Sequence, residues 1–344
     1  MCKLTPLLAL FAVLVFSSVA EARTFTDSAG RKVEVPDKIE RVMTAGPPAS
    51  VLIYALAPEK LAGWVRPPTD AEKAFLLPAA RALPTYGRLT GKGGTANIES
   101  VLAAKPDIIV DVGTINETYI SLADKVQKQT GIPYVLIDGS FAKTQDTFRL
   151  VGDLIGVPER ALRLAAYSQD TLKVLQDKLA IIPEDKRSSV YYGREPDGLE
   201  TGLSGSINLE ILDAVGARNV AAAAGKGGLT NVSLEQVLQW NPETIIAADA
   251  KFAAVARNNA DWSSIKAVKT GRVVVTPSLP FGWFDSPPGI NRLIGVRWLE
   301  HVLYPDQFGG DLRSDVRAFF KLFYQVDVTE QQLDALLADA TVTR

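Results

Sequence analysis

The sequence predicts an α/β protein with two Rossmann-like lobes, bridged by a single long α-helix, and a ligand cleft between the lobes. Three observations predict this architecture. The chain has 344 residues, which is long for a single hydrophobic core. Apolar residues recur at helical spacing from Pro158 to Ile181, and one helix of this length runs on the order of 35 Å, enough to lie along two domains. A sequence pattern also repeats on either side of this helix.

The repeated pattern joins a helix to a strand in each half of the chain. Residues 97–109 read NIESVLAAKPDII, and residues 233–245 read SLEQVLQWNPETI. The glutamate, the Val-Leu pair, the proline and the final isoleucine coincide, and Lys-Gly-Gly lies upstream of each copy. Units of this kind build parallel sheets. We therefore expect two lobes of similar construction.

We expect four segments along the chain: a signal peptide in residues 1–22, a first α/β lobe in 23–141, a bridging helical segment in 142–182 and a second α/β lobe in 183–344. In the first segment, Lys3 precedes an uninterrupted apolar run, and Ala20-Glu21-Ala22 has the small-x-small pattern of a cleavage site. The apolar run is about half of the ~20 residues that a membrane span needs. These features predict a soluble, exported protein that starts near Arg23, the alternative being an uncleaved anchor.

Strands and helices alternate in the expected first lobe after a hairpin over residues 23–36. We expect strands at 41–43, 61–65, 107–111 and 133–137, and helices at 50–56, capped by Ser50, and at 97–104. In the second lobe we expect strands at 188–192, 243–247 and 273–276, and helices at 208–215, 233–239, 290–303 and 311–324.

Composition argues against several classes of function. The net charge is −2 without a basic block, so we expect no nucleic acid partner. The single cysteine, Cys2, precedes the apolar run, whereas a lipid-attachment cysteine would follow it; the mature chain then has no thiol for a disulfide or a metal. The single histidine, His301, falls inside a helical pattern, so no histidine pair exists for zinc or for a Ser-His-Asp arrangement.

We accordingly expect no enzymatic activity, no cofactor and no resident metal site. Because carboxylates such as Asp285 and Glu200 are suitable donors, binding of a hard metal ion by this chain stays open. A secreted α/β enzyme remains a distant alternative, because the sequence offers neither a nucleophile nor a base for it.

Aromatic and arginine residues gather in the loops that follow the predicted strands. Ligands of open α/β sheets bind beyond the carboxyl ends of the strands. Aromatic rings bury ligand surface at low entropic cost, and guanidinium groups pair with carboxylates in two-point geometry. This pattern predicts a site for a bulky, partly flat, anionic ligand. The expected ligand-binding residues are Trp64, Arg66, Tyr86, Arg88, Tyr192, Arg194, Phe281, Trp283 and Arg292.

Four segments together carry a resemblance to a known family: residues 24–31, 97–110, 233–247 and 287–292. The chain resembles the periplasmic substrate-binding proteins of ABC importers for iron–siderophore complexes, haem and cobalamin, over nearly all of its mature length. The resemblance implies a ligand held between two lobes with little hinge motion. It also implies that one glutamate on each lobe docks into arginines of the membrane permease, and Glu99 and Glu235 match these positions.

The resemblance and the loops together give the leading hypothesis. We expect a monomeric periplasmic binding protein that captures a metal chelate of the iron–siderophore, haem or corrinoid class and passes it to an inner-membrane ABC permease. The alternative keeps the fold but changes the ligand to a small oxyanion or to a bare or histidine-chelated metal ion. Relatives that bind bare zinc or manganese use several histidines, whereas this chain has one.

Overall fold

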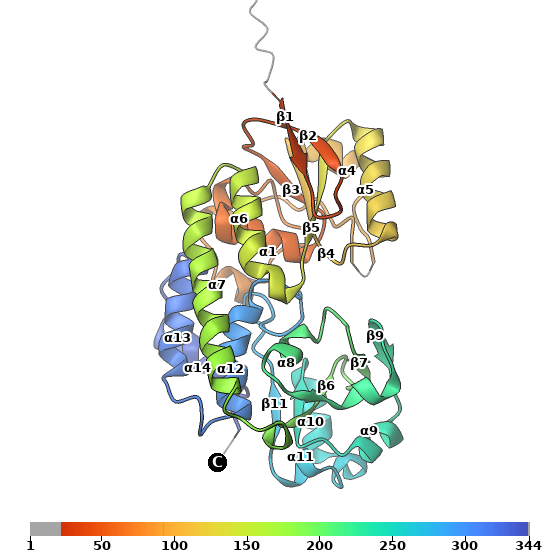
Figure 1. Ribbon diagram of the computed structural model, residues 1–344, viewed down its shortest axis with the longest axis vertical. Helices are drawn as coiled ribbons and strands as arrows, with labels where there is room; N and C mark the ends of the chain where they lie inside the picture. Colours follow the sequence, from red (N-terminus) through yellow and green to blue (C-terminus); the bar gives the residue numbers. More distant parts are fainter. Residues whose placement is uncertain (1–21, 92, 343–344) are drawn as a thin grey trace, which may run out of the picture.

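The computed structural model describes residues 22–91 and 93–342, and it forms two α/β lobes with one long helix running beside both (Figure 1). That helix is α7 (Pro158–Leu179), preceded by α6 (Thr144–Leu154), which packs against it. The predicted bridging helix is therefore confirmed, although it ends at Leu179 and not at Ile181. Pro158 occupies the first turn, where its missing N–H costs nothing.

The first lobe is built on a three-stranded parallel sheet with strand order β3–β4–β5. Its strands are β3 (Val42–Thr44), β4 (Ile108–Gly113) and β5 (Tyr134–Asp138), and the separate antiparallel hairpin pairs β1 (Ala22–Thr26) with β2 (Lys32–Pro36). Its helices are α1 (Pro47–Leu56), α2 (Asp70–Lys73), α3 (Pro78–Arg81), α4 (Ile98–Ala104) and α5 (Glu117–Thr130), with 3₁₀ turns at Pro58–Lys60 and Phe141–Lys143.

Alternation along β4 explains how the first sheet is covered on both faces. Ile108 and Val110 belong to the large core that includes α1, whereas Ile109 belongs to a smaller core with Ala123 and Val126 of α5. All five residues are fully or almost fully buried. The strand β4 is thus covered on both faces, and its last residues lie at the carboxyl edge of the sheet.

The second lobe is built on a four-stranded parallel sheet with strand order β11–β10–β6–β8. Its strands are β6 (Ser189–Gly193), β8 (Arg218–Asn219), β10 (Thr244–Ala247) and β11 (Val273–Val275), beside an antiparallel pair of β7 (Glu200–Gly202) and β9 (Leu229–Asn231). Its helices are α8 (Glu210–Ala214), α9 (Leu234–Trp240), α10 (Ala250–Asn258) and α11 (Lys266–Lys269), with 3₁₀ turns at Glu184–Lys186, Val220–Ala224 and Ala260–Trp262.

The last helices return to the long helix α7 (Figure 1). They are α12 (Arg292–Leu303), α13 (Leu312–Phe319), a π-helical turn (Phe320–Tyr324) and α14 (Glu330–Leu337). Their aromatic side chains reach the first lobe and α6: the rings of Tyr324 and Tyr54 lie 5.5 Å apart, and those of Phe323 and Phe148 of α6 lie 5.9 Å apart. One continuous core therefore ties α1, α6 and α7 to the end of the chain.

The sequence repeat has a matching local structure in both lobes. Helix α4 is capped by Asn97, and α9 is capped by Ser233, each through a side-chain oxygen that accepts a backbone N–H three residues on. Each helix ends on a left-handed residue with φ of 44°, Lys105 in one lobe and Asn241 in the other. The repeat therefore encodes the same short capped helix leading through a proline into a strand.

Several predicted elements differ from the structure. Residues 61–65 form isolated bridges at Leu61 and Trp64 and no strand. Ser50 lies inside α1 and does not cap it, because two prolines start the helix after Gly46. The helix predicted at 208–215 shrinks to α8, and the one predicted at 311–324 ends in the π-helical turn. Sequence patterns did not predict α5, α10 or α14.

The predicted signal peptide lies outside the described residues, apart from Ala22, which begins β1. Within residues 22–91 and 93–342, no helix combines the length and the apolar character that crossing a membrane requires.

Candidate ligand-binding site

A cleft of about 610 Å³ lies between the lobes and is lined by both. It opens beyond the carboxyl ends of β4, β5 and β6, where a ligand of parallel sheets is expected. The first lobe contributes Pro47, Pro48, Ser50, Trp64, Val65, Arg66, Pro68, Arg88, Thr90, Gly91, Asp111–Ile115, Tyr119, Leu136 and Ile137. The second lobe and the loop before α12 contribute Arg194, Ile207, Asn208, Leu229, Phe281 and Asp285–Pro288.

Five of the nine predicted ligand-binding residues line this cleft: Trp64, Arg66, Arg88, Arg194 and Phe281. Trp64 and Phe281 form an aromatic contact at one wall, with ring centroids 5.7 Å apart. Both are largely covered, at 2% and 9% exposure, so little of either ring is open to a ligand. The indole N–H of Trp64 donates to the carbonyl of Ala80 at 2.7 Å, which holds the ring in place.

Arg66 is already paired. Its guanidinium makes a two-point contact with the Glu72 carboxylate, at 2.8 and 2.5 Å. Glu72 also closes a capping box with Thr69 at the start of α2. Burial by itself raises the pKa of Glu72, but the hydrogen bonds from Arg66 and from the Thr69 backbone outweigh it and hold that pKa below its usual range. The Arg66 charge is therefore compensated before any ligand arrives.

Arg194 is held by two carboxylates. Its Nε lies 2.6 Å from Oδ2 of Asp285, and its Nη1 pairs with Glu200. Asp285 is 1% exposed and also accepts hydrogen bonds from Asn208 and, at 3.3 Å, from the Tyr192 hydroxyl. Burial raises the pKa of Asp285, and these contacts oppose that rise. The cluster fixes Arg194 as part of the cleft wall.

Arg88 differs from the other two cleft arginines. Its Nε donates to the carbonyl of Gly93 at 3.0 Å. In the part of the chain that the structure describes, no carboxylate lies within ion-pair distance of it. Arg88 is therefore the cleft arginine whose charge remains available to a ligand.

The other four predicted residues are not among those that line the cleft. Tyr86 packs beside Gly63 and accepts a hydrogen bond from Arg41 at 3.1 Å. Tyr192 is fully buried and stacks on Phe284 with centroids 4.1 Å apart. Trp283 is fully buried against the π-helical turn, near Phe320. The position of Trp283 after a predicted strand suggested a ligand contact, but the loop before α12 folds this ring into the core.

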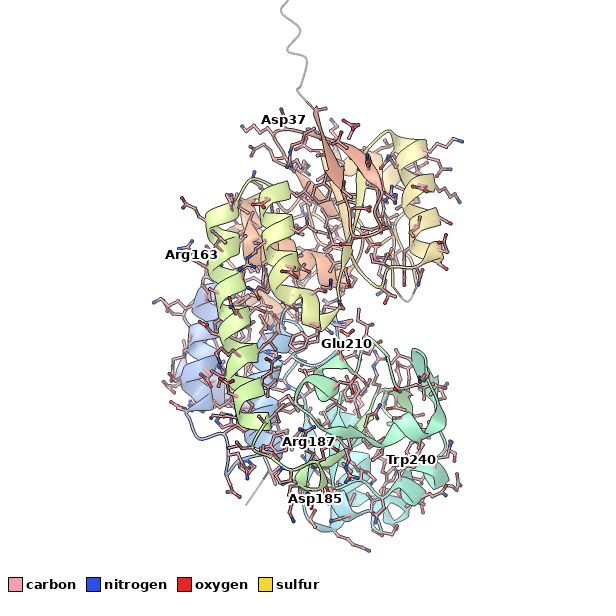
Figure 2. All side chains as sticks on the ribbon, viewed as in Figure 1. Asp37, Arg163, Asp185, Arg187, Glu210 and Trp240 are labelled. Atoms are coloured by element: carbon pink, nitrogen blue, oxygen red, sulfur yellow. The ribbon has the colours of Figure 1, made fainter. Side chains whose placement is uncertain are left out.

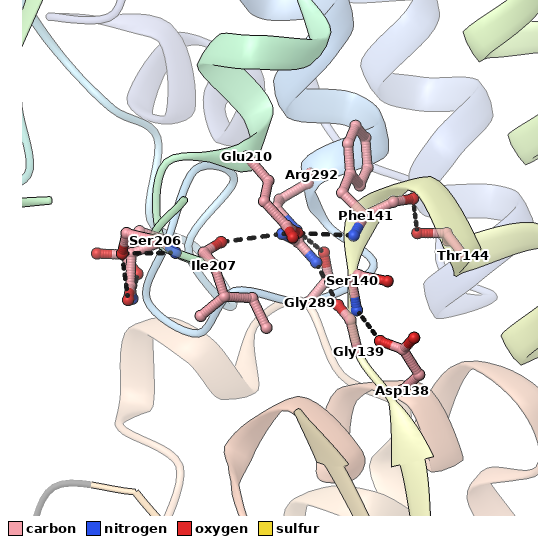
Figure 3. Close-up of polar contacts among 12 residues, drawn as sticks. Asp138, Gly139, Ser140, Phe141, Thr144, Ser206, Ile207, Glu210, Gly289 and Arg292 are labelled. Carbon is pink, nitrogen blue, oxygen red and sulfur yellow. Dashed lines mark hydrogen bonds and ion pairs between the residues drawn. The ribbon is translucent and has the colours of Figure 1, made fainter. Parts of the chain in front are cut away.

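Arg292, the fourth of these residues, lies where the lobes meet (Figure 3). It is 1% exposed, and Nη2 donates to the carbonyl of Gly139 at 2.8 Å, just after β5 of the first lobe. Nη1 donates to the carbonyl of Ile207 at 3.1 Å and to Oε2 of Glu210 at 2.9 Å, both in the second lobe. Its guanidinium also lies over the ring of Phe141, 4.9 Å from the centroid.

Glu210 completes the junction from the other side. Oε2 accepts the backbone N–H of Phe141 at 2.7 Å as well as the Arg292 guanidinium. Figure 2 labels Glu210 at the level where the two lobes meet, with Asp37 and Asp185 toward opposite ends of the molecule. Arg292 thus does not line the cleft but makes a buried contact between the two lobes.

Sequence reasoning missed several cleft residues. Asp111 and Thr90 line the first-lobe wall, Asn208 lines the second, and Pro47 and Pro48 bring the start of α1 to the cleft. Asp111 was assigned to the end of a predicted strand, and its place at a carboxyl end was the available signal. Among the described residues, no group of three or more histidine, cysteine, aspartate or glutamate side chains is arranged to hold a metal ion.

Comparison with known proteins identifies the family to which this chain belongs. A family model described as periplasmic binding protein matches residues 61–280. The chain belongs to this family. Its two-lobe fold is that of the class III periplasmic binding proteins of ABC importers.

Two curated relatives align along most of this binding protein. The molybdate-binding protein MolA of Haemophilus influenzae is 28% identical over 340 residues, covering 92% of this chain and 94% of the relative. An uncharacterized ABC transporter substrate-binding lipoprotein of Bacillus subtilis, YvrC, is 26% identical and covers 83% of this chain and 86% of the relative.

Solved structures agree with the family and the fold. An ABC transporter solute-binding protein of Sulfurospirillum deleyianum is 31% identical with a TM-score of 0.83, covering 92% of this chain and 99% of that one. MolA bound to molybdate is 26% identical with a TM-score of 0.73, covering 89% and 99%. The chain is thus a periplasmic binding protein of an ABC importer.

The two glutamates predicted to dock into the permease, Glu99 and Glu235, lie in the repeated units. Glu99 is in the first turn of α4 and Glu235 in the first turn of α9, and both are exposed. The two helices lie on the same side of α7, one in each lobe (Figure 1). A hydrogen bond from Ser233 lowers the pKa of Glu235, so this carboxylate is charged at neutral pH.

Proposed function

We propose that this binding protein captures a metal chelate in the interlobe cleft and delivers it to an ABC permease without changing it chemically. The observation that carries the proposal is a cleft of about 610 Å³ in which two of the three lining arginines are already paired. This volume falls within the 300–1,000 Å³ range of sites for drug-sized ligands.

The lining of the cleft fits an organic shell around a metal. Pro47, Pro48, Pro287 and Pro288 face the cleft together with other apolar residues, and the Trp64–Phe281 pair closes one wall. Apolar surface of this kind gains free energy by covering apolar ligand atoms. A chelate of the iron–siderophore or corrinoid class presents such atoms around its metal. Haem fits less well, because Tyr192 and Trp283, expected as flat contacts, are buried in the core.

The charge of the described cleft residues favours a ligand of low or well-spread charge. Arg66 is neutralised by Glu72, and Arg194 by Asp285 and Glu200, which leaves Arg88. A compact dianion in a partly buried site needs several donors or cations to replace its hydration. A chelate distributes its charge over a larger surface and needs fewer.

A small oxyanion of the molybdate class is the second candidate. One observation in its favour is the similarity to a molybdate-binding protein over most of the chain. The other is that the N-terminus of α1, like Arg88, lines the cleft. This helix start has no side-chain cap and no acidic residue in its first turn. A helix N-terminus carries partial positive charge and attracts anions. A bare or histidine-chelated metal ion is a further candidate ligand, with less support than an oxyanion.

We further propose that the protein works as a monomer in the periplasm after removal of residues 1–22. In this proposal residues 142–182 bridge lobes formed by residues 23–141 and 183–344. Glu99 and Glu235 dock into arginines of the permease, one from each lobe. Their matching places in two structurally similar capped helices support this role.

A fluorescence titration of the mature protein tests the ligand class. Trp64 lies in the cleft wall and reports on occupancy. The panel contains ferric hydroxamate, ferric citrate, cyanocobalamin, haem, sodium molybdate and nickel chloride. Saturable quenching by a chelate, reduced in Arg88→Gln if that chelate is anionic, is the expected result. A response to molybdate alone establishes the second candidate instead.

A further inference from the structure

A buried carboxylate in the first-lobe wall of the cleft stands without a cationic partner. Asp111, at the carboxyl end of β4, is 6% exposed and lines the cleft. Among the described residues, no arginine or lysine lies within 4.0 Å of it, in contrast to Asp285 on the opposite wall, which pairs with Arg194. A buried carboxylate that lacks an ion pair is costly and needs a reason.

Two hydroxyl groups hold Asp111 in a fixed orientation. Oδ1 accepts a hydrogen bond from Thr90 Oγ1 at 3.0 Å, and Oδ2 accepts one from the Tyr134 hydroxyl at 3.0 Å. Each hydroxyl has a single proton, and both protons are given to this carboxylate. Burial raises the pKa of Asp111, and these two bonds oppose that rise. They also fix the plane of the carboxylate at the cleft.

The two bonds leave acceptor capacity on Asp111. A carboxylate has about four lone-pair sites, and the two hydroxyl groups occupy two of them. Thr90 also lines the cleft, whereas Tyr134 is fully buried, so the carboxylate is supported from the core and lies at the cleft. The remaining sites suit an N–H or O–H donor and repel a ligand oxygen that carries negative charge.

We propose that Asp111 is a specificity-determining residue that accepts a hydrogen bond from the ligand, so the cleft selects chelates whose organic shell presents an N–H or O–H donor beside the metal. Fully deprotonated oxyanions are disfavoured at this wall by like charge. The inference rests on the proposed function and deepens it. It names the chemistry that the ligand shell must carry.

A pair of matched probes tests this without altering the protein. The ferric tris-complexes of acetohydroxamic acid and of N-methylacetohydroxamic acid share charge and metal, but only the first has N–H donors. Calorimetric titration of the wild-type protein is expected to show at least tenfold tighter binding of the N–H complex, the size of effect for a hydrogen bond to a charged acceptor. Equal affinity for the two complexes overturns the inference and leaves the proposed chelate function intact.

Protein variants then assign the preference to Asp111. In Asp111→Asn the preference for the N–H complex is expected to fall below threefold, and binding of sodium molybdate to strengthen. The matched control is Glu300→Gln, which neutralises another buried acid, on α12 away from the cleft, and is expected to keep the wild-type preference. An undiminished preference in Asp111→Asn contradicts the assignment. Failure of both complexes to bind the wild-type protein, with saturable binding of molybdate, overturns the inference and the chelate proposal together.

Discussion

The guanidinium of Arg292 and the carboxylate of Glu210 meet at 2.9 Å, between Nη1 and Oε2, at the junction of the two lobes. Arg292 also reaches the carbonyl of Gly139 in the first lobe, and Glu210 reaches the backbone N–H of Phe141 beside it. The pair therefore bonds to both lobes at once, directly at their junction. Burial lowers the pKa of Arg292, and the neighbouring Glu210 carboxylate opposes that shift.

We predict that Arg292→Gln lowers the free energy of unfolding by about 3–5 kcal/mol, because it breaks a buried pair and leaves backbone carbonyls without donors. Urea denaturation followed by circular dichroism measures this change. The control is Lys173→Gln, which removes an exposed pair with Asp177 on α7 and should cost less than about 1 kcal/mol. A loss in Arg292→Gln no larger than that of the control contradicts the role of the junction.

The three cleft arginines are predicted to differ in their effect on binding. Arg88→Gln should weaken the binding of ferric citrate, an anionic chelate, about tenfold, since Arg88 is the arginine without a carboxylate partner among the described residues. Arg66→Gln should weaken it less than threefold, because Glu72 already compensates that charge. Calorimetry at two salt concentrations measures both. Equal losses in the two variants are incompatible with this assignment.

The pH dependence of stability is predicted to contain a contribution from Glu300. Burial raises the pKa of Glu300 to about 7, against partial opposition from Arg297, Lys178 and His301. A carboxyl group with a raised pKa binds its proton more tightly in the folded state. Its contribution is therefore complete below the ordinary pKa of about 4.5 and is lost as the pH rises to about 7.

The loss over this interval should be roughly 3 kcal/mol, the free-energy equivalent of the shift. Denaturation of the wild-type protein and of Glu300→Gln at pH 5 and pH 8 measures it. The variant should lose less stability between these two pH values than the wild-type protein. Parallel pH profiles would exclude Glu300 as the source.

Delivery to the permease is predicted to depend on two exposed carboxylates that ligand binding does not need. Glu99→Gln and Glu235→Gln should each keep wild-type affinity for the chelate but reduce uptake in whole cells, and the double variant should abolish it. Glu117→Gln, in the exposed first turn of α5, is the control and should leave uptake unchanged. Normal uptake by the double variant would remove the docking role.

The two-lobe architecture could be predicted from the sequence because the hydrophobic periodicity and the local helix signals both indicate it. The 3.6-residue pattern after Pro158 and the capped repeats at Asn97 and Ser233 are local features, and the structure keeps each of them. Residues 61–65 failed as a strand because apolar character there serves burial in a loop. Local chemistry does not reveal whether an extended segment finds a partner in a sheet.

The cleft was harder to predict because its residues are chosen by long-range packing. Trp64 lies in a segment predicted as a strand and Trp283 in a loop that follows one, yet Trp283 turns into the core and Trp64 reaches the cleft wall. Arg292 was predicted to contact the ligand, and only the folded chain shows that it bonds to Gly139 in one lobe and Glu210 in the other. Asp111 lies in a strand, and nothing in its neighbours indicates that its partners are Thr90 and Tyr134.

The most direct test of the account is native mass spectrometry of the protein purified from the periplasm of cells expressing the full chain, repeated after dialysis against each candidate ligand. The account predicts a one-to-one complex whose added mass is that of a metal with an organic chelator. It also predicts reduced occupancy in Asp111→Asn and full occupancy in Glu300→Gln. An added mass equal to molybdate alone, with no chelate retained, would contradict the account.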